Sequence, residues 1–346
     1  MKDKLQEFIQ EFGFYIFILF STIVISVFAS YLPLHVDYDK FQARLAILEQ
    51  VVQDKLTNLT PTQVYSQPLW LFFSFLFFII FLTAIFIFFY LLSRFFTGKK
   101  MIETSNVCPC PLWNMKDFFK ILIWIFFWIQ LLSVVRIFIS RFKVLEFQTY
   151  LTISLLIDGI IDGVVAIILF FWLHRHYRQN VSALGLSLKN LSVDFKNALF
   201  YYLGFLPLLF ILIYTSIMFA HKVQAPSPPQ PLIYFLLFEK NRLILSLVVG
   251  FIVFVGPFVE ELFFRGLFYN ALKKSIGVFQ AMIATSIIFA VLHMNFLGFL
   301  PIFGLALLFV VMYEKTGSLK LPIFLHMIHN GFLVIIILFM RTVITA

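Results

Sequence analysis

Long runs of apolar residues alternate with short polar or proline-containing breaks along almost the whole chain. A helix needs roughly 20 apolar residues to cross the hydrocarbon core of a bilayer. Such runs lie near 13–34, 68–94, 117–140, 148–174, 197–220, 243–273, 277–297, 298–313 and 321–341. The pattern therefore predicts an all-α fold, a polytopic transmembrane helix bundle of about nine helices.

Composition excludes a soluble protein, because 62% of the residues are hydrophobic and only 12% are charged. The net charge of +9 does not indicate a nucleic-acid partner, since the basic residues are scattered through short loops between the apolar runs. Basic loops stay on the inner side of a membrane. Their distribution here predicts an integral membrane protein with its N-terminus in the cytoplasm and the bilayer as its surroundings.

Two segments between the apolar runs suggest how the chain is organised. Residues 38–57 place apolar side chains at helical spacing and predict an amphipathic helix. Residues 225–231, APSPPQP, predict a stiff extended connector. We expect an N-terminal membrane extension of about four helices over 1–195 and a catalytic membrane core over 196–346, with its motifs between 256 and 330.

Ionisable side chains deep inside apolar runs are candidates for function, because an unpaired charge in hydrocarbon costs several kcal/mol. Most of them lie in the last third of the chain. They are Asp158, Asp162, Glu260, Glu261, Arg265, His293, His326 and His329.

The segment GPFVEELFFRG, residues 256–266, combines helix-breaking residues with two carboxylates. Gly256 and Pro257 predict a broken helix, whose free N–H groups would favour the negative charge that follows. Arg265 lies four residues after Glu261 and is expected to neutralise it. Glu260 then faces a different neighbour.

Depth in the membrane predicts that four polar residues meet. At 1.5 Å of rise per residue, Glu260 lies about 20 Å from Lys273, and His293 lies about 24 Å from Gly277. His326 and Asn330 lie about 9 to 15 Å from Lys320. Helix tilt reconciles these depths, so we expect all four side chains to face one cavity.

A carboxylate, two imidazoles and an amide in such a pocket suit hydrolysis of an amide bond. Glu260 would take a proton from water, and Asn330 would donate to the developing oxyanion. The histidines would orient the water or hold a metal. His326 and Asn330 share a helix face, whereas His329 points elsewhere and is expected to be dispensable.

Other hydrolytic or metal sites find little support in the sequence. There is no HExxH zinc motif and no GxSxG serine elbow. Asp158 and Asp162 share one helix face rather than opposing each other, and Gly159 and Gly163 beside them predict close helix packing. The cysteines of the loop VCPCPLW, Cys108 and Cys110, are too close for an ordinary disulfide and lack partners for zinc.

The three motifs EELFFRG, FAVLH and HMIHN together resemble the signature of the CAAX-prenyl-endopeptidase and bacteriocin-processing (CPBP, CAAX protease self-immunity) family of intramembrane metalloproteases. The resemblance covers roughly residues 245–340. It implies catalytic roles for the glutamates, histidines and amide of the motifs, with Arg265 as the motif's arginine; the residues are Glu260, Glu261, His293, His326 and Asn330.

The resemblance implies an intramembrane endopeptidase that acts on a peptide or on a lipid-anchored or membrane protein, and the residue usage hints at a bacterial inner membrane. Two alternatives stay open for the cofactor. Either Zn²⁺ or another divalent metal binds His293, His326 and Glu260, or these residues hold only a catalytic water. Two other functions stay open as well: a non-proteolytic immunity or scaffold protein that binds a peptide, and a transporter.

Overall fold

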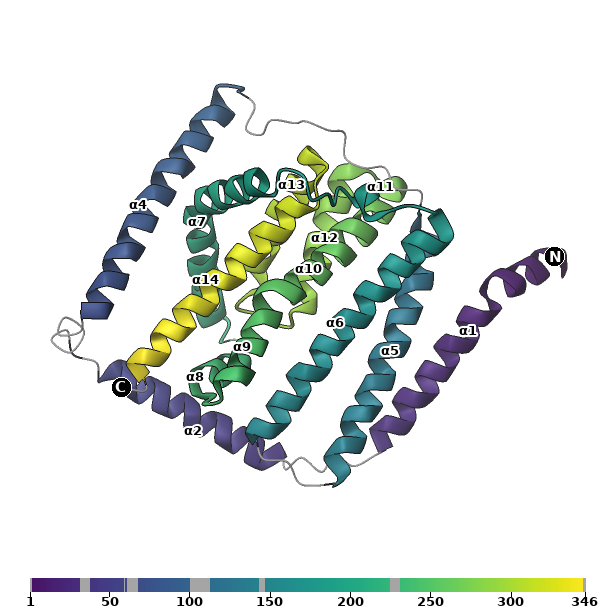
Figure 1. The fold of residues 1–346 in the computed structure, drawn as a ribbon, viewed down its shortest axis with the longest axis horizontal. Coiled ribbons are helices and arrows are strands. Elements are labelled where there is room, and N and C mark those ends of the chain that lie inside the picture. The colour runs from purple at the N-terminus through teal and green to yellow at the C-terminus, as the bar shows by residue number, and fades with distance from the viewer. Residues whose placement is uncertain are drawn as a thin grey trace.

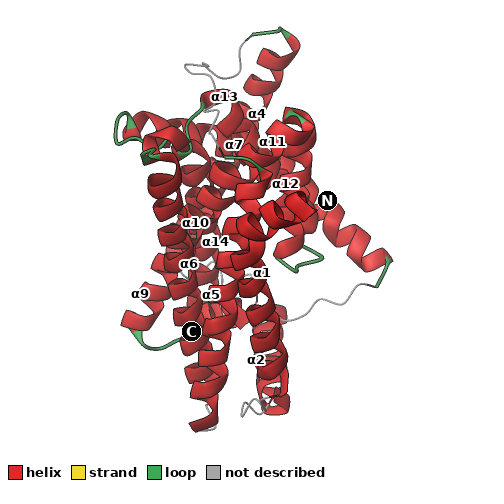
Figure 2. Ribbon diagram, turned by 90° about the vertical axis from the view of Figure 1, so that its right-hand side faces the viewer, coloured by secondary structure: helices red, strands yellow, loops and turns green. Residues whose placement is uncertain are grey.

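The computed structural model describes residues 2–31, 38–58, 60, 68–99, 113–142, 147–224 and 231–344. The cysteines Cys108 and Cys110 and most of the proline-rich connector lie outside these residues. Every regular element within the described ranges is a helix (Figure 2). The predicted all-α fold is confirmed.

The first half of the chain forms four helices of 28 to 31 residues, one transverse helix of 20 residues and a short 3₁₀ turn. They are α1 (Lys2–Tyr31), α2 (Tyr38–Thr57), α4 (Pro68–Phe96), α5 (Met115–Phe142), α6 (Phe147–Tyr177) and the single 3₁₀ turn η1 (Val181–Leu184). The amphipathic segment of the sequence is α2, which lies across one end of the bundle (Figure 1). Leu45 of this helix is buried, while Ile47 and Val51 are exposed.

The second half adds the helices that carry the three motifs. They are α7 (Leu191–Lys222), α8 (Pro231–Phe238), α9 (Arg242–Gly250), η2 (Phe251–Val255), α10 (Gly256–Glu261), η3 (Leu262–Tyr269), α11 (Asn270–Ile276), α12 (Val278–Leu292), α13 (Phe299–Thr316) and α14 (Lys320–Ile344). The elements from α9 to α11 follow one another without a gap. They make one helix of 35 residues.

Seven of the described helical stretches are long and apolar enough to cross a membrane. They are Trp70–Phe96, Met115–Val135, Thr152–Tyr177, Leu191–Lys222, Arg242–Ile276, Phe299–Thr316 and Lys320–Thr342. Two shorter apolar stretches, Phe12–Ile25 and Val278–Leu292, complete the nine runs of the sequence. Each predicted run therefore corresponds to one observed helix.

Basic loops meet at one end of the bundle. Lys274 donates to the carbonyl of Trp113, Lys320 donates to the carbonyl of Lys189, and Lys273 pairs with Glu314 at 3.0 Å. The loops that precede α5 and α7, and those that follow α11 and α13, thus lie together. This is the arrangement expected if all of them face the same side of a membrane.

The N-terminal helices α5 and α6 share one hydrophobic core with the motif-bearing helices. Ile121 of α5 and Leu169 of α6 belong to the same buried cluster as Leu262 and Tyr313. In lipid such packing depends on van der Waals contact rather than on exclusion of water. The predicted extension therefore packs directly against the segment that carries the glutamates.

Candidate active site

The glutamate-bearing helix is continuous, so the predicted break at Gly256 and Pro257 is wrong. Val255, Gly256 and Leu262 all have right-handed helical dihedral angles. The departure from α geometry consists of two π-helical stretches, η2 before these residues and η3 after them. Wide turns of this kind absorb a proline without ending the helix, and they often occur at functional sites.

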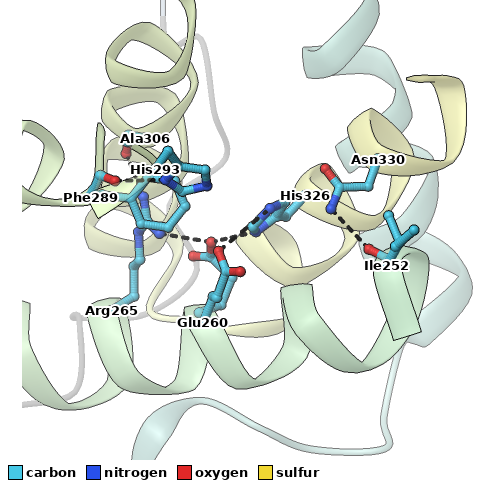
Figure 3. A network of polar contacts seen from close by, with 9 residues as sticks. Ile252, Glu260, Arg265, Phe289, His293, Ala306, His326 and Asn330 are labelled. Carbon is cyan, nitrogen blue, oxygen red and sulfur yellow. Dashed lines mark hydrogen bonds and ion pairs between the residues drawn. The ribbon is translucent and has the colours of Figure 1, made fainter. Parts of the chain in front are cut away.

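Pro257 nevertheless leaves a main-chain carbonyl available. In the π register of η2 the N–H of Gly256 bonds to the carbonyl of Phe251, five residues back. The carbonyl of Ile252 would be served by residue 257, but proline has no N–H. The side-chain amide of Asn330 donates to this carbonyl instead, at 2.9 Å (Figure 3). The Gly-Pro pair thus supplies the acceptor that orients Asn330.

Glu261 and Arg265 form the ion pair that their spacing predicts. The Nη1 atom of Arg265 lies 2.7 Å from Oε1 of Glu261, and both side chains are almost fully buried. The other guanidinium nitrogen donates to the carbonyl of Ala306 at 2.9 Å. The guanidinium also lies over the rings of Phe289 and Phe309, at 4.8 and 5.3 Å from their centres. These contacts fix both members of the pair.

His326 lies between the two glutamates. Its Nδ1 is 3.0 Å from Oε1 of Glu261, and its Nε2 is 3.9 Å from Oε2 of Glu260 (Figure 3). An ionised carboxylate only accepts hydrogen bonds, so Nδ1 carries the hydrogen, and in the neutral tautomer that this defines Nε2 is the acceptor turned toward Glu260. The gap to Glu260 exceeds a hydrogen bond, and a water that donates to both atoms would lie to one side of the line that joins them.

Glu260 is rotated away from the Arg265 pair, as expected. Its side chain is 38% exposed, yet Oε2 is enclosed and has no hydrogen-bond partner among the described residues. Enclosed polar atoms are normally satisfied by protein or water. This oxygen therefore marks a position for a water or substrate donor.

His293 ends α12 at the rim of the site. Its Nδ1 lies 2.7 Å from the carbonyl of Phe289, and because a carbonyl only accepts, Nδ1 carries the hydrogen. In the neutral tautomer that this defines, Nε2 is the acceptor. Met294, the next residue, has a positive φ of 49° and an 85% exposed side chain, so the chain turns sharply after the histidine.

One cavity of about 590 Å³ collects the four residues that were expected to meet: Glu260, His293, His326 and Asn330 all line it. Its other end is apolar and lies between α8 and the second half of α14. The apolar walls include Leu232, Ile233, Leu236, Leu333, Val334 and Ile337. The convergence inferred from depth is thus present, while the catalytic roles stay predictions.

His329, which was expected to be dispensable, lies near the other polar residues of the site. Its Nδ1 lies 3.1 Å from the hydroxyl of Tyr202 on α7, which agrees with the expectation that it turns away from His326. The side chain nevertheless borders the same cavity. Its spacing of three residues from His326 was the available signal, because i,i+3 neighbours also share a helix surface.

The two aspartates of α6 differ in their surroundings. Asp158 is exposed, whereas Asp162 approaches the glutamate-bearing helix, with Oδ2 4.0 Å from the point where a Cβ on Gly256 would lie. The glycines beside them also differ: a Cβ on Gly159 would lie 2.6 Å from the ring of Phe251, and one on Gly163 would contact nothing within 4 Å. Only the first glycine permits close packing.

The donors proposed for a metal do not form a cluster. His293, His326 and Glu260 have the right chemistry, since imidazole nitrogen and carboxylate oxygen bind Zn²⁺. Within the part of the chain that the structure describes, however, no three His, Cys, Asp or Glu side chains lie close enough together to hold a metal ion. The described geometry therefore does not fit a three-ligand site.

Comparison with known proteins shows sequence similarity in the last third of the chain. The family model for type II CAAX prenyl endopeptidases of the Rce1-like kind matches residues 242–332. The membrane-embedded CAAX protease MroQ of Staphylococcus aureus is 36% identical over 98 residues, which cover 26% of this chain and 39% of that protein. A Bacillus subtilis protein named "Putative membrane peptidase YdiL" is 33% identical over 81 residues, 23% of this chain and 33% of the relative.

The chain thus spans well under half the length of either curated relative. No solved structure is detectably similar to it. The matched segment contains all three motifs and the four cavity residues that were expected to meet. The resemblance noted in the sequence is confirmed over this segment: residues 242–332 match the model of the Rce1-like CAAX prenyl endopeptidase family.

Proposed function

We propose that this protein is an intramembrane endopeptidase that hydrolyses a peptide bond in a peptide or membrane-associated protein. The observation that carries the proposal is the enclosed Oε2 of Glu260, which accepts no hydrogen bond from the described residues and faces Nε2 of His326 across 3.9 Å at the polar end of the cavity. The match of residues 242–332 to the model of a peptidase family supports the same activity.

In this mechanism a water molecule lies between Glu260 and His326. Glu260 takes one proton from the water while the oxygen forms a bond to the carbonyl carbon of the scissile peptide. An amide N–H of Asn330 donates to the oxyanion of the tetrahedral intermediate. Glu260 then gives its proton to the leaving nitrogen as the C–N bond breaks, so that the products are a carboxylic acid and an amine.

Glu261, Arg265 and His293 have supporting roles. Glu261, which is paired with Arg265, accepts the Nδ1 hydrogen of His326, so that Nε2 remains an acceptor for the water. His293 offers a second acceptor from the opposite side of the cavity. No step is assigned to a metal, because the donors that would bind it are not clustered.

The substrate is expected to enter the cavity from within the bilayer. Its apolar side chains would contact the walls formed by α8 and α14, while the scissile bond reaches the polar end. The basic loops at one end of the bundle favour an orientation with that end and the N-terminus in the cytoplasm. We expect the protein to reside in a bacterial inner membrane.

Comparative peptidomics of cells that carry either the wild-type protein or the Glu260→Gln variant tests the proposal. Peptides whose termini depend on Glu260 are the expected result, and purified protein should reproduce the cleavage in liposomes. Asp158→Asn is the matched control, because it removes a carboxylate from a span without touching the cavity. Cleavage at the full rate by Glu260→Gln would exclude a peptidase that uses this residue and would favour a peptide-binding scaffold.

A further inference from the structure

Asn270 is a fully buried amide outside the three motifs and outside the cavity lining. Its Nδ2 lies 3.0 Å from the carbonyl of Arg265, 2.9 Å from the carbonyl of Gly266 and 2.9 Å from the hydroxyl of Tyr313. Two hydrogens thus serve three acceptors. A side chain that donates to two main-chain carbonyls of its own helix is unusual, since an α-helix normally satisfies its own carbonyls.

The irregular geometry of η3 explains why these carbonyls need a side chain. In an α-helix the N–H of Asn270 would bond to the carbonyl of Gly266, four residues back. Here that N–H bonds to the carbonyl of Leu267, three residues back. The main-chain N–H of Asn270 is therefore directed at Leu267, and its side-chain amide bonds to the carbonyls of Arg265 and Gly266 where the π-helical stretch returns to α geometry.

This turn is also the one from which Arg265 projects. Its carbonyl is held by Asn270, and its guanidinium is held between Glu261 and the carbonyl of Ala306. Glu261 in turn holds Nδ1 of His326 at 3.0 Å. Consecutive hydrogen bonds thus connect Asn270 to the imidazole that faces Glu260.

We propose that Asn270 is a positioning residue, which fixes the π-helical turn of Arg265 and through it the hydrogen bond between Glu261 and His326. The effect on the position of the His326 ring follows from the geometry alone. The effect on catalysis rests on the proposed peptidase function. Asn270 itself contacts neither the cavity nor a substrate bound in it.

The test compares Asn270 variants with a matched variant of the same helix interface. Asn270→Leu keeps the approximate volume and removes both donors, and Asn270→Ser keeps one hydroxyl donor in a smaller side chain. Tyr269→Phe removes a buried hydroxyl that donates to Glu314 at 2.8 Å but leaves the π-helical carbonyls untouched. Each protein is purified in full length and placed in lipid nanodiscs.

The first readout needs no substrate. Protein labelled with ¹⁵N-histidine contains seven imidazoles, and the His326 signals are assigned by their loss in His326→Gln. The Nδ1 signal reports its hydrogen bond to Glu261. We expect it to shift in both Asn270 variants and to stay in place in Tyr269→Phe, although all three lower the unfolding temperature.

The second readout is the cleavage rate on a substrate found by peptidomics. We expect kcat to fall on the order of 100-fold in Asn270→Leu with KM little changed, because misplacement by about 1 Å has effects of this size. Asn270→Ser should lie between Asn270→Leu and the wild type, and Tyr269→Phe should keep the wild-type kcat.

Unchanged His326 signals in folded Asn270 variants would overturn the proposal. So would a failure of both variants to fold while Tyr269→Phe folds, because Asn270 would then serve overall stability. If the wild-type protein cleaves no peptide but the His326 signal shifts as expected, the positioning role stands and the peptidase function fails.

Discussion

The Nδ1 atom of His326 lies 3.0 Å from Oε1 of Glu261, so a single hydrogen bond joins two motifs that are 65 residues apart. This contact gives the two neighbouring glutamates different tasks. Glu261 is fully buried; it accepts a hydrogen bond from Nδ1 of the ring and forms an ion pair with Arg265. Glu260 faces the other ring nitrogen from the cavity side.

The two glutamates should therefore differ in what their loss changes. Glu261→Gln leaves the Arg265 guanidinium buried without a full counter-charge, and breaking such a pair costs about 3 to 5 kcal/mol. Glu260→Gln should leave stability nearly unchanged and lower the cleavage rate about 10²- to 10⁴-fold, as expected for loss of a general base. Thermal unfolding in detergent and product formation in liposomes measure the two effects. Equal unfolding temperatures for the two variants would contradict this division.

Asn330 should be coupled energetically to Pro257. Asn330→Leu leaves the carbonyl of Ile252 without its donor, and an unsatisfied buried acceptor costs about 1 to 3 kcal/mol. Pro257→Ala restores a main-chain N–H near this carbonyl, so Asn330→Leu should cost less in that background. A double-mutant cycle of unfolding free energies measures the coupling. Additive effects would show that the proline does not create the need for Asn330.

The two glycines of α6 should respond differently to alanine. In Gly159→Ala the added Cβ would meet the ring of Phe251, and overpacking of this kind costs about 1 to 3 kcal/mol. Gly163→Ala meets nothing within 4 Å and should be neutral or stabilising by up to about 1 kcal/mol, since alanine favours helices. Unfolding temperatures of the two variants provide the test. Phe251→Ala should relieve the cost at residue 159 but not alter residue 163.

Removal of divalent metals should leave cleavage largely intact. No three His, Cys, Asp or Glu side chains among the described residues are placed to hold a metal ion, and His326 already uses Nδ1 on Glu261. We expect less than about a twofold change in rate after chelation, well below the effects of about 10²-fold that follow loss of a catalytic group. Elemental analysis of the purified protein is the control. A stoichiometric metal that disappears in His293→Ala would establish the metal-bound alternative.

Much of this arrangement was predictable from the sequence. The apolar runs located the helices because the hydrocarbon core fixes their length and composition. The positions of Glu260, His293, His326 and Asn330 relative to basic helix ends indicated a shared cavity, because helical rise converts residue number into depth. The ion pair of Glu261 and Arg265 followed from their spacing.

Other features depended on information that spacing does not contain. Gly256 and Pro257 indicated a break, but the choice between a break and a π-helical turn depends on which neighbour satisfies the freed carbonyl, and Asn330 lies 78 residues away from Ile252. Asn270 is one polar residue near a helix end, where asparagine is common. Its role emerges only once the irregular turn of η3 is known.

The π-helical turn η2 has a consequence for insertions and deletions in this region. A π-helical hydrogen bond spans one residue more than an α-helical bond, so η2 accommodates an additional residue within a continuous helix. Deleting one residue between Phe251 and Val255 would convert the stretch to regular α-helix, and the flanking segments would keep their facing directions. Such a chain would retain its membrane span and both glutamates, and Pro257 would again lack the N–H for the carbonyl four residues before it. The length of this segment therefore sets the width of the turn, while the proline sets which carbonyl is left for Asn330.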